Sequence, residues 1–258
     1  MRTLMLTLFF IANTSWASEP TERAASVLAT FDAGTLHHLE SVQPRATRAG
    51  WLRIVDDTVV SETGAPWLIH QLASNPDAHP AVRVAWADAM VRALRADPHA
   101  FGWEDAWVEL ASSDRDSKVR ALLFAGMRHG DPSFAIPALK QGLTHEDPAT
   151  RAAAADGLAW HPQGLMAAKA LRGAFVDQDV EVRKMAATAA GYLGDAEAFT
   201  GLVALLEDAD PLVRAAAIRS LERVAPDASR ALPQMVDLAQ DPHTQIQRAA
   251  SHLLNSGS

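Results

Sequence analysis

The sequence predicts an all-α protein, an α-solenoid of about seven stacked helical hairpins. A two-residue anchor recurs along the chain at intervals of 31 to 37 residues. Around the later anchors, apolar residues follow at helical spacing. A period of this size with one helix signal in each period is typical of stacked helix pairs. The anchors are Thr47-Arg48, Val82-Arg83, Val119-Arg120, Thr150-Arg151, Val182-Arg183, Val213-Arg214 and Ile246-Gln247.

The stretch 208–224 shows the unit most clearly. Val213 is followed by Ala216, Ala217 and Leu221, offsets that place all four on one side of a helix. Asp210-Pro211 precedes them. An acidic N-cap followed by proline marks a helix start, because the carboxylate accepts from free N–H groups and proline has none to leave unpaired.

Two acidic positions recur before the anchors. We expect the second to cap the inner helix, and the first to pair with an arginine, its own or a neighbour's, in a ladder along the stack. A feature that occurs once in each repeat indicates structure rather than a unique active site. The first stands six places before the second anchor residue at Asp77, Asp114, Asp177, Asp208 and Asp241, and His145 replaces it before Arg151. The second stands four places before that anchor residue at Asp116, Asp147, Asp179 and Asp210. The predicted ladder therefore includes Asp177, Arg183, Asp208 and Arg214.

These residues resemble the HEAT-repeat family, most closely its PBS-lyase HEAT-like type. The resemblance covers 112–255 and, less closely, 34–111. It implies an outer helix, a turn with the aspartate, and an inner helix that begins near the anchor. The family includes scaffolds, chromophore lyases and a metal-dependent hydroxylase, so the fold alone does not define an activity.

The helices can be placed along the chain from turn signals such as Gly130-Asp131-Pro132 and Gly194-Asp195. We expect inner helices near 148–160, 180–193, 211–224 and 244–254, and outer helices near 132–143, 163–175, 196–206 and 228–239.

The N-terminal region divides into a signal peptide, a cap and the solenoid. Residues 1–17 combine Arg2, a short apolar run and Ser15-Trp16-Ala17, which is the pattern of a cleaved secretory signal. Residues 18–44 are expected to form capping helices, since a terminal repeat needs a cover on its open face. Residues 45–258 form the predicted solenoid as one domain.

Composition limits the compartment and the partners. The chain has no cysteine, which excludes thiol catalysis, thiolate metal sites and a lipidated cysteine. Removing 1–17 takes away one arginine, so the formal charge changes from −8 to −9. An acidic chain with dispersed lysines disfavours nucleic acid and anionic membranes. We expect export, to a periplasm, without membrane insertion after cleavage.

No catalytic set is apparent. His37-His38 cannot share one ion on a helix, and His145-Glu146 is the only His-Glu pair, whereas the hydroxylase of this repeat class uses several. His129 and His161 end successive inner helices, where histidine usually interacts with free carbonyls. We expect no metal site and no cofactor.

The inner helices of such stacks usually line the binding surface. Residues six places after the anchors should point there, together with a partly exposed tryptophan after Thr150, since exposed tryptophan is a common binding anchor. Trp51 and Trp86, in contrast, are expected in the core. The candidate partner-binding residues are Arg53, Asp88, Asp156, Trp160 and Arg219.

The sequence favours a non-catalytic exported scaffold that binds a protein or peptide. Two other interpretations remain open at this point. One is an enzyme of the chromophore-lyase or metal-dependent hydroxylase type, which the resemblance alone supports. The other is a structural spacer with permanent partners in a larger envelope assembly.

Overall fold

The computed structural model describes residues 68–69, 72–78, 80–96 and 104–256. Within these residues the protein is entirely helical, which confirms the predicted all-α solenoid. The signal peptide, the capping helices, Arg53 and Trp51 lie outside the described residues. No helix in the described part of the chain is long and apolar enough to cross a membrane.

The chain forms two compact units, Met1–Leu123 and Phe124–Ser258. In the first unit the structure describes α6 (Pro80–Ala96), α7 (Glu104–Ser113) and most of α8 (Ser117–Gly126). Trp86 is buried in this unit, as predicted for a core residue. Trp107 is also fully buried, and its indole N–H donates to the carbonyl of Leu123 over 3.2 Å.

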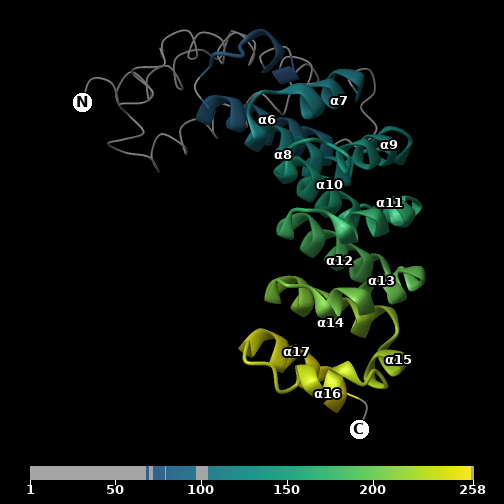
Figure 1. Ribbon diagram of the computed structural model, residues 1–258. Helices are drawn as coiled ribbons and strands as arrows, with labels where there is room; N and C mark the ends of the chain where they lie inside the picture. Colours follow the sequence, from purple (N-terminus) through teal and green to yellow (C-terminus); the bar gives the residue numbers. More distant parts are fainter. Residues whose placement is uncertain (1–67, 70–71, 79, 97–103, 257–258) are drawn as a thin grey trace, which may run out of the picture. The chain divides into compact units, whose positions relative to one another are not determined.

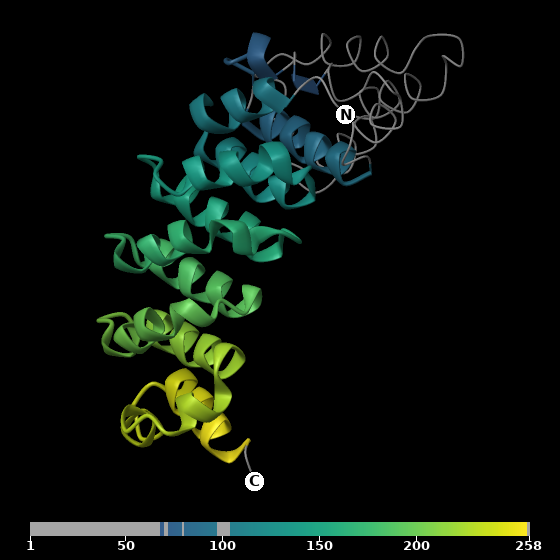
Figure 2. The ribbon, with the colours of Figure 1, turned by 90° about the vertical axis from the view of Figure 1, so that its right-hand side faces the viewer.

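The second unit is a regular stack of hairpins (Figure 1). Its inner helices are α10 (Pro148–Trp160), α12 (Val180–Leu193), α14 (Pro211–Val224) and α17 (Thr244–Asn255). These bounds confirm the predicted inner helices to within one residue. Each packs against the next, α10 on α12, α12 on α14 and α14 on α17. Figure 2 shows the same succession from the side.

The outer helices are shorter and less regular than the inner ones. The first, α9, is continuous over Pro132–Gly142. The next two are α11 (Ala168–Gly173) and α13 (Phe199–Ala204), and each is extended at both ends by 3-10 turns. With these turns they cover Gly164–Val176 and Ala196–Glu207, close to the predicted ranges.

The predicted outer helix near 228–239 is wrong as a single element. The structure has two short helices there, α15 (Pro226–Arg230) and α16 (Gln234–Leu238). Pro233 stands between them, where it offers no N–H and restricts the residue before it. The chain therefore bends at Leu232-Pro233 instead of continuing the helix.

Small residues set the spacing of the inner helices. Val182, Ala186 and Ala190 on α12 are fully buried, as are Val213 and Leu221 on α14. The approach is closest at Gly191, where an added Cβ would lie 2.5 Å from the hydroxyl of Ser220. Alanine and glycine at these positions let two helix backbones pack without larger side chains between them.

Two of the inner helices have the predicted aspartate cap, whereas the side chain of Asp147 does not cap α10 and instead accepts from the hydroxyl of Thr150 at 2.7 Å. Asp179 and Asp210 each accept from the first free N–H groups of the inner helix that follows. Gly194 ends α12 in the left-handed conformation, with φ of 64°. That backbone conformation is open to glycine at little cost, because it has no Cβ to clash.

Candidate interaction surface

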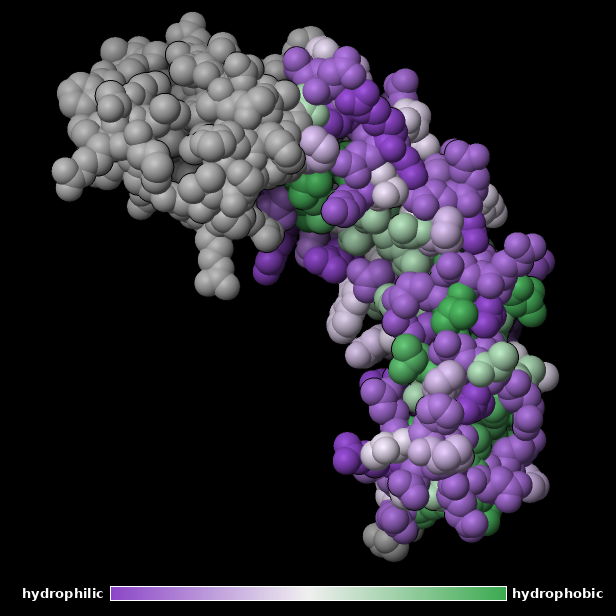
Figure 3. Space-filling view, turned by 60° about the vertical axis from the view of Figure 1, so that its left-hand side comes forward, coloured by the Kyte–Doolittle hydropathy of each residue, from purple (hydrophilic) through white to green (hydrophobic). Residues whose placement is uncertain are grey.

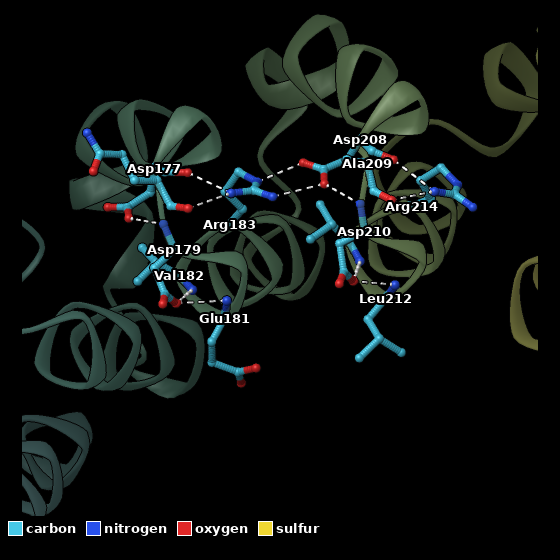
Figure 4. Close-up of polar contacts among 12 residues, drawn as sticks. Asp177, Asp179, Glu181, Val182, Arg183, Asp208, Ala209, Asp210, Leu212 and Arg214 are labelled. Carbon is cyan, nitrogen blue, oxygen red and sulfur yellow. Dashed lines mark hydrogen bonds and ion pairs between the residues drawn. The ribbon is translucent and has the colours of Figure 1, made fainter.

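A ladder of ion pairs runs along the turns of the second unit (Figure 4). Each arginine of an inner helix reaches the aspartate of the next hairpin, not its own. Arg183 pairs with Asp208 at 2.7 Å and Arg151 pairs with Asp177 at 2.8 Å. Arg214 forms the next ion pair of the series, with Asp241 at 3.4 Å.

Each arginine also forms hydrogen bonds with the backbone of its own turn. The Nη1 group of Arg183 donates to the carbonyls of Asp177 and Gln178 at 2.8 and 3.1 Å. Arg214 repeats this geometry on the carbonyl of Asp208 at 2.9 Å. One guanidinium thus joins two adjacent turns, which is possible because its five N–H donors point in a fixed planar fork.

The ladder carboxylates are held in the charged form. Hydrogen bonds from Arg151 lower the pKa of Asp177 below its usual value. Burial alone would raise the pKa of Asp208, but hydrogen bonds from Arg183 and the backbone of Asp210 outweigh it, and that pKa is also lowered. These groups are structural, since their lone pairs are already used.

The first unit contains an equivalent pair. Arg83 and Asp114 are both buried and form an ion pair, and the guanidinium also donates to the carbonyls of Leu72 and Asn75. Arg83 belongs to one anchor, and Asp114 precedes the next anchor. The pair therefore follows the same rule as those of the second unit.

The inner helices of the second unit present an exposed aromatic pair. Trp160, the last residue of α10, is 53% exposed, and Tyr192 on α12 is 46% exposed. Their ring centres lie 4.6 Å apart. The guanidinium carbon of Arg223 on α14 lies 4.6 Å from the centre of the tyrosine ring, a cation–π contact. Three successive inner helices thus contribute one side chain each to a continuous row.

The row is fixed in place by polar contacts. The indole N–H of Trp160 donates to Asp156 over 3.2 Å, and Asp156 lies 3.6 Å from Arg128. The structure thus brings Asp156 and Trp160 together among the predicted surface residues. Arg219 is exposed on α14. Asp88 lies in the first unit, where it forms a pair with Arg92 on its own helix.

Comparison with known families agrees with this architecture. The family model of HEAT repeats matches residues 104–177 and 167–255, which together cover more than half of the chain. The chain belongs to the HEAT repeat family. Curated proteins were also compared with this HEAT repeat protein, and none of them matches it.

Solved structures show the same fold at low identity. An engineered protein is 22% identical with a TM-score of 0.54, over 74% of this chain and 99% of its own. A computationally designed armadillo repeat protein for modular peptide recognition is 20% identical with a TM-score of 0.54, over 75% and 100%. A designed armadillo repeat protein in complex with the peptide (KR)4 is 19% identical with a TM-score of 0.54, over 75% and 99%. At these identities the likeness concerns the fold.

His161 of this HEAT repeat protein is part of the fold. His161 is only 3% exposed. Its Nδ1 accepts from the backbone N–H of Gln163, so its proton is on Nε2, which donates to the carbonyl of Gly130 at 3.1 Å. Burial lowers the pKa of His161. Across residues 72–78, 80–96 and 104–256, no three metal-ligating side chains gather at one point.

Sequence reasoning missed Tyr192 and Arg223. Both stand ten places after an anchor, as Trp160 does after Thr150. The predicted surface was based on the sixth position after each anchor, and Trp160 was the only residue at the tenth position that it included. Comparing the tenth position across repeats would have found the row, although not the contact between its members.

Proposed function

We propose that this HEAT repeat protein is an exported, non-catalytic scaffold that binds a protein or peptide along its inner helices. The observation that carries the proposal is the exposed pair of Trp160 and Tyr192. Aromatic side chains that are exposed yet held by their neighbours supply contact area at low entropic cost, and they are enriched in binding hot spots. Stacked repeats provide the extended surface on which such proteins usually bind partners.

The arrangement of polar groups also supports a binding role. The carboxylates of the ladder are engaged by arginine and backbone donors, and His161 is engaged at both ring nitrogens. A catalytic group needs a free lone pair or proton directed at a substrate. Direct observation of turnover by the pure protein would contradict this part of the proposal.

A site-specific cross-linking experiment tests the binding role. A photoreactive phenylalanine analogue replaces Tyr192, and the protein is irradiated in its own envelope fraction. We expect one dominant adduct by mass spectrometry. The matched control carries the same analogue at Lys140, which is exposed on the outer helix α9. Equal capture from both positions, or none from either, would contradict binding along the inner helices.

Export is supported by the charge and apolar pattern of residues 1–17. We expect the mature protein to begin at Ser18 and to occur in the periplasm. The mass of the protein purified from its native cells measures this directly. A mass that includes residues 1–17 would contradict cleavage.

A further inference from the structure

Three arginines on the inner helices of the second unit lack an acidic partner. Arg219 and Arg223 lie on α14, Arg248 lies on α17, and all three are exposed. None of them forms an ion pair with any residue that the structure describes. Arg223 instead covers the ring of Tyr192, and its Nη1 donates to the carbonyl of Arg219 over 3.2 Å.

Two of the three acidic side chains on the inner helices of the second unit are paired with cations. Asp156 faces Arg128, and Glu181 pairs with Lys184 at 2.6 Å. Glu222 lies 2.9 Å from the ring of His252. The uncompensated charge on this surface is therefore positive, although the whole chain has a formal charge of −8. A positively charged surface on a protein of negative net charge favours partners of negative charge.

The surface is otherwise polar. In Figure 1 the inner helices α10, α12 and α14 lie to the left of the outer helices α11 and α13, and Figure 3 brings the left-hand side of that view forward. Hydrophilic residues predominate on that face, with scattered apolar ones between them. A partner must therefore be recognised by a few aromatic and charged contacts and not by a broad apolar area.

We propose that the partner segment is an extended acidic peptide that carries an aromatic residue. Its ring stacks on Trp160 and Tyr192, and its carboxylates pair with Arg219 and Arg223. Guanidinium groups bind carboxylates through two parallel hydrogen bonds, which gives both affinity and direction. This inference rests on the proposed function and names the chemistry of the partner.

The spacing of the helices sets the spacing of the peptide. Neighbouring packed helices lie about 8–10 Å apart. A chain in the extended polyproline II form advances about 3.1 Å per residue with three residues per turn, so residues three positions apart face the same side. One inner helix therefore corresponds to about three peptide residues. We expect the aromatic residue and the first acidic residue to stand about three positions apart.

The same cations suit a nucleic acid less well. Strong nucleic-acid binding needs clustered lysines and arginines that neutralise successive phosphates. Here the arginines without an acidic partner are three, Arg219, Arg223 and Arg248, on two helices. They are too few to neutralise a run of successive phosphates, whereas a peptide needs only one or two carboxylates to pair with them.

Fluorescence anisotropy on the full chain tests the proposal with three labelled probes. The first is an extended peptide with phenylalanine and glutamate three positions apart, the second replaces glutamate by lysine, and the third is a single-stranded oligonucleotide. We expect the acidic peptide to bind at least about tenfold more tightly than the other two. Arg219→Glu should weaken it at least about tenfold, and Trp160→Ala about fivefold.

Lys169→Glu is the matched control. Lys169 is exposed on the outer helix α11, so this variant has the same change in charge on a different face. We expect its affinity to stay within about twofold of the wild type. Thermal melting verifies that Arg219→Glu folds, since the side chain of Arg219 is exposed and has no ion pair.

Several outcomes would overturn the inference. They are equal binding of the lysine peptide, preferential binding of the oligonucleotide, insensitivity to Arg219→Glu, and no binding of the acidic peptide. The cross-linking at position 192 separates these from failure of the scaffold role. A captured partner whose cross-linked segment is not acidic keeps the scaffold role and rejects the acidic peptide.

Discussion

His161 connects two hairpins through one buried imidazole. Its two ring nitrogens serve an N–H donor and a carbonyl acceptor, so the neutral form is the one that fits. Protonation would place a second proton on Nδ1, which faces the N–H of Gln163. The site therefore links the charge state of one side chain to the packing of the stack.

We expect stability to fall in mild acid because of this residue. Burial lowers the pKa of His161 in the folded chain, while the unfolded chain keeps an ordinary value of about 6.5. The unfolded state then binds more protons below about pH 6.5, and the free energy of unfolding decreases as pH falls from there through the folded pKa.

Denaturant titrations between pH 8 and 5 measure this effect. The comparison is between the wild type and His161→Gln, which does not titrate but keeps an N–H donor. The variant should have the shallower dependence on pH in this range. If the free energy of unfolding depended equally on pH in the two proteins, His161 would not be the source of the pH dependence.

Gly191 is required by a close approach of two helices. A Cβ there would lie 2.5 Å from the Oγ and 2.8 Å from the Cα of Ser220. We expect Gly191→Ala to lower the free energy of unfolding by about 1–3 kcal/mol, since the helices must separate to accept it. Gly173→Ala is the control, because nothing lies within 4 Å of its added Cβ. A similar loss in both variants would contradict the packing argument.

At the scale of the element, the inner and outer helices obey different constraints. The inner helices α12 and α14 are capped by aspartate, and each packs against an inner helix on both sides, which keeps them long and regular. The outer helices are interrupted by 3-10 turns and, in the last hairpin, by Pro233. The contacts between stacked inner helices therefore keep the repeats regular.

The aspartate cap gives a prediction at this scale. Asp210 accepts from the N–H groups of Leu212 at 2.7 Å and Val213 at 3.4 Å. We expect Asp210→Ala to lower the free energy of unfolding by about 1 kcal/mol, because these donors lose their acceptor. Asp210→Asn keeps a side-chain oxygen and should recover most of the loss. Denaturant unfolding of both variants measures the difference, and equal losses would reject the cap.

At the scale of the whole molecule, the ladder joins each hairpin of the second unit to the next. In a solenoid each repeat contacts only its neighbours, so stability is a sum of local interfaces. Arg151, Arg183 and Arg214 each cross one such interface in the second unit. Loss of one rung is therefore expected to weaken one interface and leave the others intact.

The ladder also predicts the response to strong acid. The pKa values of Asp177 and Asp208 are lowered in the fold, whereas the unfolded chain keeps about 3.9. Their contribution to the free energy of unfolding is complete above about pH 3.9. It is lost as the pH falls through the pKa values of these two groups in the folded chain. Melting temperatures between pH 5 and 2.5 should fall steeply for the wild type. The variant with Asp177→Asn and Asp208→Asn should start lower and fall less, and parallel curves would contradict the assignment.

Much of the fold followed from local pattern. The anchors, their period and the Asp-Pro signals predicted the four later inner helices, because each helix is specified by its own caps and its own apolar face. The outer helix near 228–239 was mispredicted as one element, because Pro233 separates two short helices there. Arg172, which pairs with the buried Asp195 at 2.6 Å, was not predicted at all.

By itself, the sequence determined the repeat, the residues that form its turns and the exposure of Trp160. Only the tertiary structure decided which side chains from different hairpins contact one another. Whether an arginine reaches its own aspartate or the next one depends on how two hairpins stack, and Trp160, Tyr192 and Arg223 are neighbours only through that stacking. Sequence spacing fixes directions along one helix, whereas distances between helices depend on the volumes packed between them.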